Sequence, residues 1–398
     1  MLRIGRGRRP QTAMLVAVLA VTSACAEDPE EHEPRGGPAP VATQRSNGTT
    51  SDAPATDEAL VSEDPAPVTS ELPVSSDEVQ VLGPVATGLD TPWDVDFLSD
   101  GSALVPLRDQ GLVLHLTEGE TVTLDAGGPG RAVPGVEHGV EDGLLGLAVG
   151  PDDAIYLYLT TESDNRVVRY RLEGDTLLDA QVILAGIPTY ENHVGGRIAF
   201  GPDGFLYITT GDTRDLELPQ DPDSLAGKIL RVTSDGAPAP GNPFGNEVWS
   251  MGHRNVQGIG WTSDGRMYAS EFGSSDYDEL NLIEPGADYG WPQIEGWAGD
   301  PDFVDPLVTW TTDEASPSGI AVTDDGVWMT ALRGERLWFV PLGPDGSVGE
   351  PQEHQLGLGR LRAVTWAPDG TLWIVTSNTD GRGEPGDLDD QILRLEVP

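Results

Sequence analysis

The segment from Glu191 to Asp212 carries the residue types that proton-transfer chemistry needs. His193 precedes a short apolar run, and a Pro-Asp-Gly turn at 202–204 returns the chain to Asp212. A hairpin brings the residue before its first strand and the residue after its second strand to the same end. The sequence therefore predicts a histidine base beside a carboxylate. A single histidine is more often a packing or hydrogen-bonding residue, so its chemistry depends on what other segments bring to that end.

Five further hairpins of the same kind occur between residues 77 and 398. Each has a short apolar strand, a turn of Asp-Gly or Asp-Asp type, and a second strand rich in aliphatic and aromatic residues. The turns recur about every 44 to 61 residues, the period of four-stranded propeller blades. We therefore predict an all-β fold, a six-bladed β-propeller of four-stranded antiparallel blades, closed by pairing 78–85 with 391–397.

The loops that flank the first two strands of each blade are predicted to share one face of the ring, opposite the Asp-Gly turns. The chain has only 23 basic residues against 66 acidic ones, yet many of the basic residues fall in these loops. Several arginines around one histidine indicate a polyanionic ligand, because guanidinium groups bind carboxylates through paired hydrogen bonds. The residues so gathered are Glu141, Asp142, His193, Arg197, Asp212, His253, Arg254, Asn255, the segment 271–274 that begins with Glu271, Arg333, Arg360 and Arg362.

The net charge of −43 and the lack of a basic stripe exclude nucleic acid as a partner. Only one lysine, Lys228, and one cysteine, Cys25, are present, so no intramolecular disulfide can form. The acidic run 276–279 is expected in a solvated loop. It could equally bind calcium, because hard cations prefer oxygen ligands.

The first 76 residues have the composition of a targeting segment and a linker. Residues 1–25 combine four arginines, an apolar run at 13–21 and small residues before Cys25, as in a bacterial lipoprotein signal peptide. An ordinary secretory signal remains the alternative, and the Arg8-Arg9 pair leaves Sec or twin-arginine export open. Residues 26–76 are rich in Pro and acidic residues, which predicts a disordered linker. We expect an extracytoplasmic protein anchored to the membrane through a lipid on Cys25.

Several segments of the predicted propeller follow one another as in a known family. The most specific are Gly-His-Arg-Asn at 252–255 and Asp-Tyr-Gly-Trp-Pro at 288–292, together with Asn-His at 192–193 and Gly-Arg-Leu-Arg at 359–362. Over about 85–397 the chain resembles the soluble quinoprotein glucose dehydrogenase and glucose/sorbosone dehydrogenase family. The resemblance implies an enzyme that holds pyrroloquinoline quinone (PQQ) and Ca²⁺ on the loop face and oxidises an aldose at its anomeric carbon.

The resemblance also implies roles for individual residues. His193 would be the general base, oriented by Asp212, while Arg254 would polarise the quinone oxygen with support from Asn255. Backbone carbonyls of Gly273 and Ser274 would hold Ca²⁺ as a Lewis acid. From the acidic run 276–279 we add Asp278 as a predicted calcium ligand. The remaining contacts to the cofactor would come from Glu141, Arg333, Arg360 and Arg362.

Some positions depart from the pattern of the glucose enzyme. Arg333 stands in place of a lysine, Ser274 in place of a proline, and Glu141 in place of a neutral amide, and a tryptophan that would stack on the quinone is not located. Two alternatives therefore stay open: a non-catalytic propeller that binds a carbohydrate or a protein, and a calcium-dependent lactonase-type hydrolase. The sugar and the electron acceptor are not identified by the sequence.

Overall fold

The structure is a computed structural model and describes residues 78–398. The predictions of a signal peptide (1–25), a lipidated Cys25 and a linker (26–76) lie outside the described residues. Within 78–398 the secondary structure is all β apart from two short 3₁₀ helices, η1 (Pro129–Arg131) and η2 (Leu218–Gln220). No helix in this part of the chain is long and apolar enough to cross a membrane.

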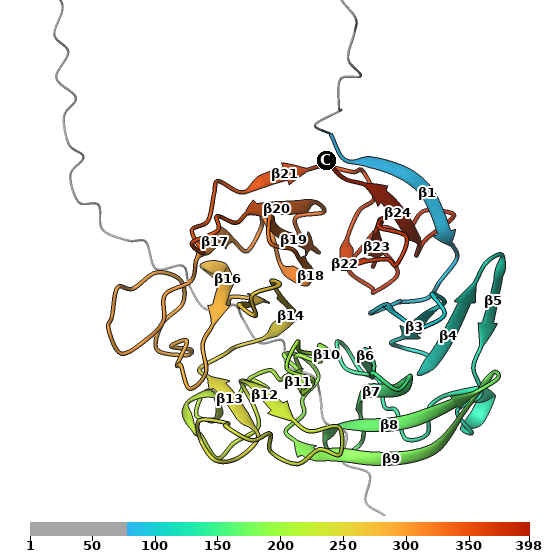
Figure 1. The fold of residues 1–398 in the computed structure, drawn as a ribbon, viewed down its shortest axis with the longest axis horizontal. Helices are drawn as coiled ribbons and strands as arrows, with labels where there is room; N and C mark the ends of the chain where they lie inside the picture. The colour runs from blue at the N-terminus through green and yellow to red at the C-terminus, as the bar shows by residue number, and fades with distance from the viewer. Residues whose placement is uncertain (1–77) are drawn as a thin grey trace, which may run out of the picture. The chain divides into compact units, whose positions relative to one another are not determined.

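The strands form six four-stranded antiparallel sheets arranged as blades around a central axis (Figure 1). The predicted six-bladed β-propeller is confirmed. Blade 1 contains β2 (Asp96–Phe97), β3 (Ala103–Leu107), β4 (Leu112–Thr117) and β5 (Glu120–Thr123); blade 2 contains β6 (Leu144–Val149), β7 (Ala154–Thr160), β8 (Asn165–Glu173) and β9 (Thr176–Ile187); blade 3 contains β10 (Ile198–Phe200), β11 (Leu206–Thr209), β12 (Lys228–Val232) and β13 (Val248–Met251).

The second half of the ring repeats this arrangement. Blade 4 contains β14 (Val256–Trp261), β15 (Met267–Glu271), β16 (Tyr277–Ile283) and β17 (Val308–Thr311); blade 5 contains β18 (Pro317–Val322), β19 (Gly326–Ala331), β20 (Leu337–Pro341) and β21 (Gln352–His354); blade 6 contains β22 (Leu361–Trp366), β23 (Leu372–Thr376) and β24 (Ile392–Glu396), and takes its outer strand from β1 (Gln80–Ala86).

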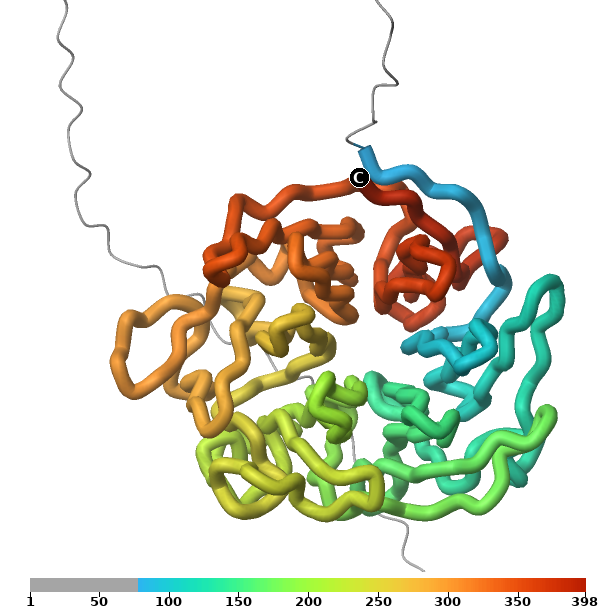
Figure 2. Tube along the Cα trace, in the orientation of Figure 1, coloured from blue at the N-terminus to red at the C-terminus, as the bar shows by residue number. Residues whose placement is uncertain are grey.

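The ring closes through blade 6, as the sequence predicted. Strand β1 runs antiparallel to β24, with Gln80 opposite Glu396 and Ala86 opposite Ile392. Figure 2 shows the first described residues lying beside the end of the chain. Blade 6 thus combines the two ends of the propeller, which joins the first blade to the last by backbone hydrogen bonds.

Glycines allow the innermost strands of neighbouring blades to approach closely. The Gly146 N–H donates to the Gly196 carbonyl over 3.0 Å, and a Cβ at Gly146 would collide with that oxygen. A Cβ at Gly258 would collide with the Ser318 carbonyl in the same way. A side chain at either position would push two blades apart, which explains the small residues in these strands.

Apolar side chains fill the interfaces between the blades. Tyr156 of blade 2 packs edge-on against Phe200 of blade 3, with ring centroids 5.1 Å apart, and Phe97 of blade 1 meets Trp373 of blade 6 at 5.0 Å. Such pairs add about 0.5–1.5 kcal/mol each to the burial of their area. The core therefore holds the blades at fixed positions, and with them the loops on each face.

The expectation that residues 276–279 form a solvated loop is wrong for its second half. Strand β16 begins at Tyr277, and Asp278 and Glu279 are 1% and 9% exposed. The Glu279 carboxylate accepts hydrogen bonds from the Asn281 side chain and the Gly296 N–H. The Asp278 carboxylate likewise accepts two backbone N–H groups. These hydrogen bonds replace water and allow both carboxylates to be buried in a strand.

Candidate active site

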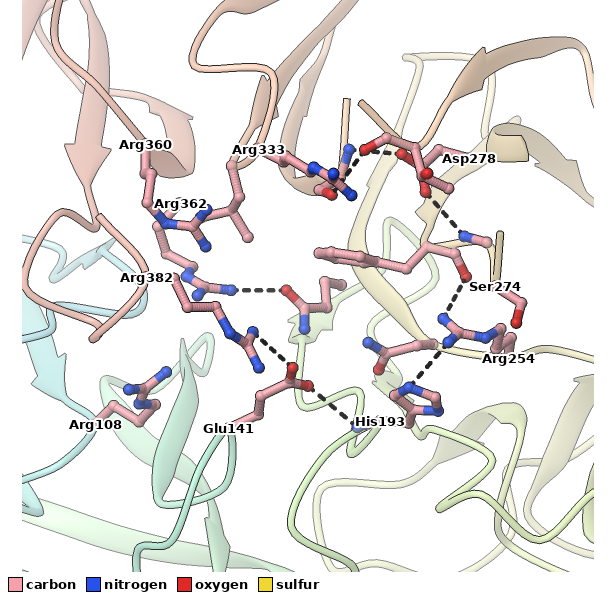
Figure 3. Close-up of a pocket in the computed structure, with 17 residues that line it drawn as sticks. Arg108, Glu141, His193, Arg254, Ser274, Asp278, Arg333, Arg360, Arg362 and Arg382 are labelled. Atoms are coloured by element: carbon pink, nitrogen blue, oxygen red, sulfur yellow. Dashed lines mark hydrogen bonds and ion pairs between the residues drawn. The ribbon is translucent and has the colours of Figure 1, made fainter. Parts of the chain in front are cut away.

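A polar pocket of about 540 Å³ opens over the centre of the ring, on the face opposite the Asp-Gly turns. It is lined by loops from all six blades, and six of its residues are arginines (Figure 3). Its lining includes Arg108, Glu141, His193, Arg254, Asn255, Gln257, Phe272, Gly273, Ser274, Asp278, Ser316, Arg333, Arg360, Arg362 and Arg382.

His193 and Asp212 form the predicted pair at the end of the blade 3 hairpin. Nδ1 of His193 lies 2.8 Å from Oδ1 of Asp212, which is almost fully buried behind the histidine. A Cβ on Gly211 would overlap the His193 carbonyl, so only glycine permits this approach. His193 itself has φ of +55°, a left-handed conformation that is rare for a residue with a side chain.

The neighbours of His193 fix the position of its proton. Nη2 of Arg254 lies 2.9 Å from Nε2 of His193. A guanidinium group can only donate, so Nε2 must accept, and the ring proton must then lie on Nδ1, where it donates to Asp212. The Nε2 lone pair of His193 is then directed at Arg254, whose guanidinium lines the same pocket. Nε2 can act as a general base once that hydrogen bond is exchanged for one to a ligand.

Asp212 remains ionised although it is buried. Burial alone would raise the pKa of its carboxyl. The hydrogen bonds from His193 and from the backbone N–H of Arg214, with a further one from the Trp291 indole, outweigh burial and lower the pKa below its usual value. A carboxylate in this position stabilises the positive charge that His193 acquires when it takes a proton.

A buried hydrogen-bond network behind Arg254 fixes the backbone from which its side chain extends. Both oxygens of the Glu271 carboxylate are used: one accepts the Arg254 N–H and the other lies 2.9 Å from Nδ1 of His253. The other ring nitrogen of His253 lies 2.8 Å from the Ser250 hydroxyl. Glu271 was predicted at the pocket, but it lies beneath it and positions Arg254. The Nε of Arg254 is buried without a hydrogen-bond partner.

Arg360 directly precedes β22 and Arg362 is the second residue of that strand, on the opposite side of the pocket from His193 (Figure 3). Arg360 makes two hydrogen bonds to Asp380, of 2.9 and 3.1 Å, and Arg362 donates to Gln257 over 2.8 Å. Arg362 is 3.6 Å from the same Asp380. Burial, followed by the charge of Arg108, lowers the pKa of Arg362 to about 9. One carboxylate is shared between two buried guanidinium groups, which leaves a concentration of positive charge.

Glu141 connects this arginine group to the histidine. Its carboxylate lies 2.7 Å from Nη1 of Arg382 through one oxygen and accepts the His193 backbone N–H over 3.2 Å through the other (Figure 3). Burial would raise the pKa of Glu141, but the charge and hydrogen bond of Arg382 outweigh it and lower that pKa. The ion pair therefore joins a loop of blade 2 to a loop of blade 6 across the pocket.

The three residues expected to hold calcium lie together at the edge of the pocket. The Asp278 carboxylate accepts the N–H groups of Gly273 and Ser316 over 2.9 and 2.6 Å, and burial raises its pKa to about 6. A single oxygen of Glu295 accepts the N–H groups of residues 274–277 and so shapes the loop that contains Ser274. No cluster of three metal-ligating side chains occurs among residues 78–398.

Most of the predicted site residues come together in the structure. Eleven of them line the pocket, and Asp212 lies directly behind His193. The side chain of Arg333 is 62% exposed and pairs with Asp313, which is 76% exposed. Arg197, predicted at the same face, does not line the pocket: it is buried against Asp94 and over the Trp93 ring.

Sequence reasoning missed several residues of the site. Arg108 directly follows β3 and Arg382 follows β23, so both obey the rule that residues after the second strand reach this face. That rule, applied to every blade, would have found them. Phe272, which was expected at this face with the other residues after β15, is the aromatic residue of the pocket lining. Trp291 reaches Asp212 from the long loop between β16 and β17. No local pattern marks the contact made by Trp291.

Fold and site together define a β-propeller with an enzyme-type site, in which a histidine–carboxylate pair faces a group of arginines. The chain belongs to the Glucose / Sorbosone dehydrogenase family, which it matches over residues 89–393. The resemblance drawn from the motifs is thereby confirmed, and the protein is an enzyme of the sugar dehydrogenase kind.

Individual relatives agree with this assignment. The aldose sugar dehydrogenase YliI of Escherichia coli is 28% identical over 74% of this chain and 89% of its own length. Quinoprotein glucose dehydrogenase B of Acinetobacter calcoaceticus is 31% identical over 41% of this chain and 42% of its own length. Among solved structures, the PQQ-bound form of an aldose sugar dehydrogenase from Streptomyces coelicolor is 48% identical with a TM-score of 0.76, over 81% of this chain and 98% of that one.

Proposed function

We propose that this protein is a PQQ-dependent dehydrogenase that oxidises the anomeric carbon of an aldose, with His193 as the general base. The observation that carries the proposal is the arrangement of His193 between Asp212 and Arg254, at the wall of an arginine-lined pocket. The similar protein from Streptomyces coelicolor is described as PQQ-bound, which supports the same cofactor here.

The charge of the pocket fits PQQ, which carries three carboxylates. Arg360 and Arg362 share one carboxylate, and Nε of Arg254 is buried without a partner. Negative groups of a ligand would satisfy these donors, and removing charged groups from water is favourable only when they are paired. Arg254, Asn255, Arg360 and Arg362 would hold the cofactor, with Arg333 and Glu141 at the rim. When bound, PQQ supplies a two-electron hydride acceptor.

The residues of this chain would handle the proton. Nε2 of His193 accepts the proton of the sugar's anomeric hydroxyl, while Nδ1 keeps its own proton and its bond to Asp212. The imidazolium so formed is stabilised by the ionised Asp212. A ligand that draws Nη2 of Arg254 toward itself frees the Nε2 lone pair for this proton, and the protonated Nε2 can no longer accept from Arg254. Proton removal and the redirection of Arg254 are in this way coupled.

Calcium is proposed at Asp278 with the carbonyls of Gly273 and Ser274. The support is a buried carboxylate with a pKa raised to about 6, whose only partners are two backbone N–H groups. A nearby cation would favour its ionised form. Carbonyl oxygens would have to complete the ligand set. Calcium bound there would act as a Lewis acid toward the cofactor.

We further propose that the protein works outside the cytoplasm, held at the outer side of the cytoplasmic membrane through a lipid on Cys25. This proposal rests on the composition of residues 1–25 and 26–76 alone. An electron acceptor outside the chain must reoxidise the cofactor after each turnover. Labelling expressed protein with a radioactive fatty acid would test the anchor: label in the wild type and none in Cys25→Ser is expected, and equal labelling contradicts it.

The function is tested by adding PQQ to the purified protein in the presence and absence of Ca²⁺. We expect saturable binding seen in the quinone absorbance and PQQ-dependent reduction of a redox dye by at least one aldose from a panel. Binding without turnover would favour a binding propeller, and hydrolysis of a lactone with Ca²⁺ alone would favour a hydrolase. Either result would remove the dehydrogenase assignment.

A further inference from the structure

We infer that Trp291 is a positioning residue for His193, acting through Asp212 and Arg254. The inference rests on the proposed function, because it assigns Trp291 a part in orienting the base. Trp291 belongs to the Asp-Tyr-Gly-Trp-Pro segment at 288–292, which does not line the pocket and takes no direct part in the proton transfer.

The contacts form a closed circuit around His193. Nε1 of Trp291 donates to Oδ2 of Asp212 over 2.8 Å, and Oδ1 of the same carboxylate is 2.8 Å from Nδ1 of His193. Nη2 of Arg254 is 2.9 Å from Nε2 of His193. The guanidinium carbon of Arg254 then lies 5.4 Å from the centroid of the Trp291 ring, within the range of a cation–π contact. One indole thus touches both residues that hold the imidazole.

Hydrogen bonds fix the backbone of Trp291, so that its indole N–H is held in place beside Asp212. Its N–H donates to the Gly252 carbonyl over 2.9 Å, and its carbonyl accepts from Nε2 of Gln220 over 3.0 Å. The same Gln220 nitrogen donates to Asp288 over 2.8 Å, which in turn accepts the Gly290 N–H. The N–H and the carbonyl of Trp291 are therefore both bonded to blade 3, and Gln220 links that blade to the turn at 288–290 as well.

The indole N–H determines how the Asp212 carboxylate is turned. Oδ1 serves His193 and the Arg214 backbone, while Oδ2 has Trp291 as its donor. Without that donor, the carboxylate could rotate about its Cβ–Cγ bond and withdraw Oδ1 from Nδ1. The charged groups that face His193 are Asp212, Arg254 and Glu141, the last paired with Arg382. Among these contacts, only the Trp291 indole N–H bonds Oδ2.

Two substitutions separate the N–H group from the bulk of the ring. In Trp291→His, the five-membered ring places an N–H near the position of the indole Nε1, whereas Trp291→Phe has no donor. A hydrogen bond to a charged group corresponds to about a ten- to hundredfold change in rate. We expect kcat/KM of the PQQ-loaded protein to fall by that factor in Trp291→Phe and by about threefold or less in Trp291→His. Trp297→Phe is the matched control: it removes an indole N–H from the same loop, but that N–H is bonded to the Pro306 carbonyl.

A second measurement does not depend on turnover. In the protein without cofactor, ¹⁵N NMR of the histidine rings should show the His193 proton on Nδ1 in the wild type, in Trp291→His and in Trp297→Phe. In Trp291→Phe we expect this signal to broaden or to shift toward the other tautomer. The His193 resonance is assigned with His193→Gln, and the cooperative unfolding of each variant is recorded.

Three results would overturn the inference. The first is a Trp291→Phe protein with wild-type kcat/KM and an unchanged His193 signal. The second is an equal loss in Trp291→Phe and Trp291→His, which would assign the effect to ring volume. The third is a Trp291→Phe protein that no longer unfolds cooperatively, which would assign Trp291 a purely structural role. A wild type that binds PQQ without oxidising any sugar would refute the proposed function instead, while the NMR result would still test the inference.

Discussion

Replacing Asp212 with asparagine tests the central pair while changing almost no volume. Asp212 accepts three N–H groups: those of His193 and Arg214 at Oδ1 and that of Trp291 at Oδ2. Asparagine has a single acceptor oxygen. Because two donors converge on Oδ1, the amide oxygen should take that position and turn its own NH₂ toward the indole N–H. The tautomer of His193 would then be kept, and the charge behind it would be lost.

The size of the effect follows from these contacts. Loss of a charge-assisted bond to the imidazolium costs about 1.5–3 kcal/mol, and the unpaired indole N–H raises this toward 3–4 kcal/mol. We therefore expect kcat to fall by about 10²- to 10³-fold. A larger fall in kcat, near 10⁴-fold, would instead indicate that the asparagine forces His193 into the other tautomer.

The assay is dye reduction by an aldose at saturating PQQ, with the PQQ Kd measured separately by absorbance. Asp223→Asn, which changes an exposed carboxylate in the same blade, serves as the control and should keep full activity. A kcat within threefold of the wild type, in an Asp212→Asn protein that still binds PQQ, would refute the role given to the pair.

Three further predictions concern affinity and stability. Arg362→Met should weaken PQQ binding by about ten- to hundredfold in an absorbance titration, since it removes a buried donor facing the pocket; unchanged affinity would place the cofactor elsewhere. Lys228→Met should lower the free energy of unfolding in urea by about 3 kcal/mol or more, because the Lys228 ammonium is bonded to three backbone carbonyls that would lose their donor. Burial raises the pKa of Asp278 to about 6, and burial with the charge of Glu271 raises that of Glu279 to about 7. The folded protein therefore binds more protons than the unfolded chain between about pH 4 and 7. Protonation of these two carboxyl groups stabilises the fold at low pH, and this stabilisation is lost as the pH rises through 6 to 7. The urea midpoint without cofactor should be higher at pH 5 than at pH 7.5, and the opposite order would contradict these two pKa directions.

The parts of the fold that repeat could be predicted from the sequence. Six Asp-Gly or Asp-Asp turns, each between two apolar strands, fix the number of blades, and hairpin geometry then decides which loops share a face. His193, Arg254 and Arg360 line the pocket as predicted because each precedes the first strand of its blade. The closing strand β1 was predicted because a propeller leaves no other partner for the last blade.

The rest depends on contacts between residues far apart in the chain. Trp291 reaches Asp212 across 79 positions of sequence, from a loop without a repeating pattern. Asp278 and Glu279 look like solvent-exposed acids, but backbone N–H groups and the Asn281 side-chain amide donate to their carboxylates and make their burial tolerable. Arg197 flanks a first strand as His193 does, but its ion pair with Asp94 keeps it out of the pocket. Hydrophobic periodicity carries no information about such polar pairings.

The most direct test of the account is a single-turnover measurement on His193→Gln. Wild-type protein loaded with PQQ is mixed with an excess of an aldose, without an electron acceptor, and the quinone absorbance is followed. We predict a rapid spectral change in the wild type and a rate at least about 10³-fold slower in His193→Gln, with the PQQ Kd unchanged in the variant. A His193→Gln protein that reduces PQQ at the wild-type rate would contradict the claim that His193 is the base.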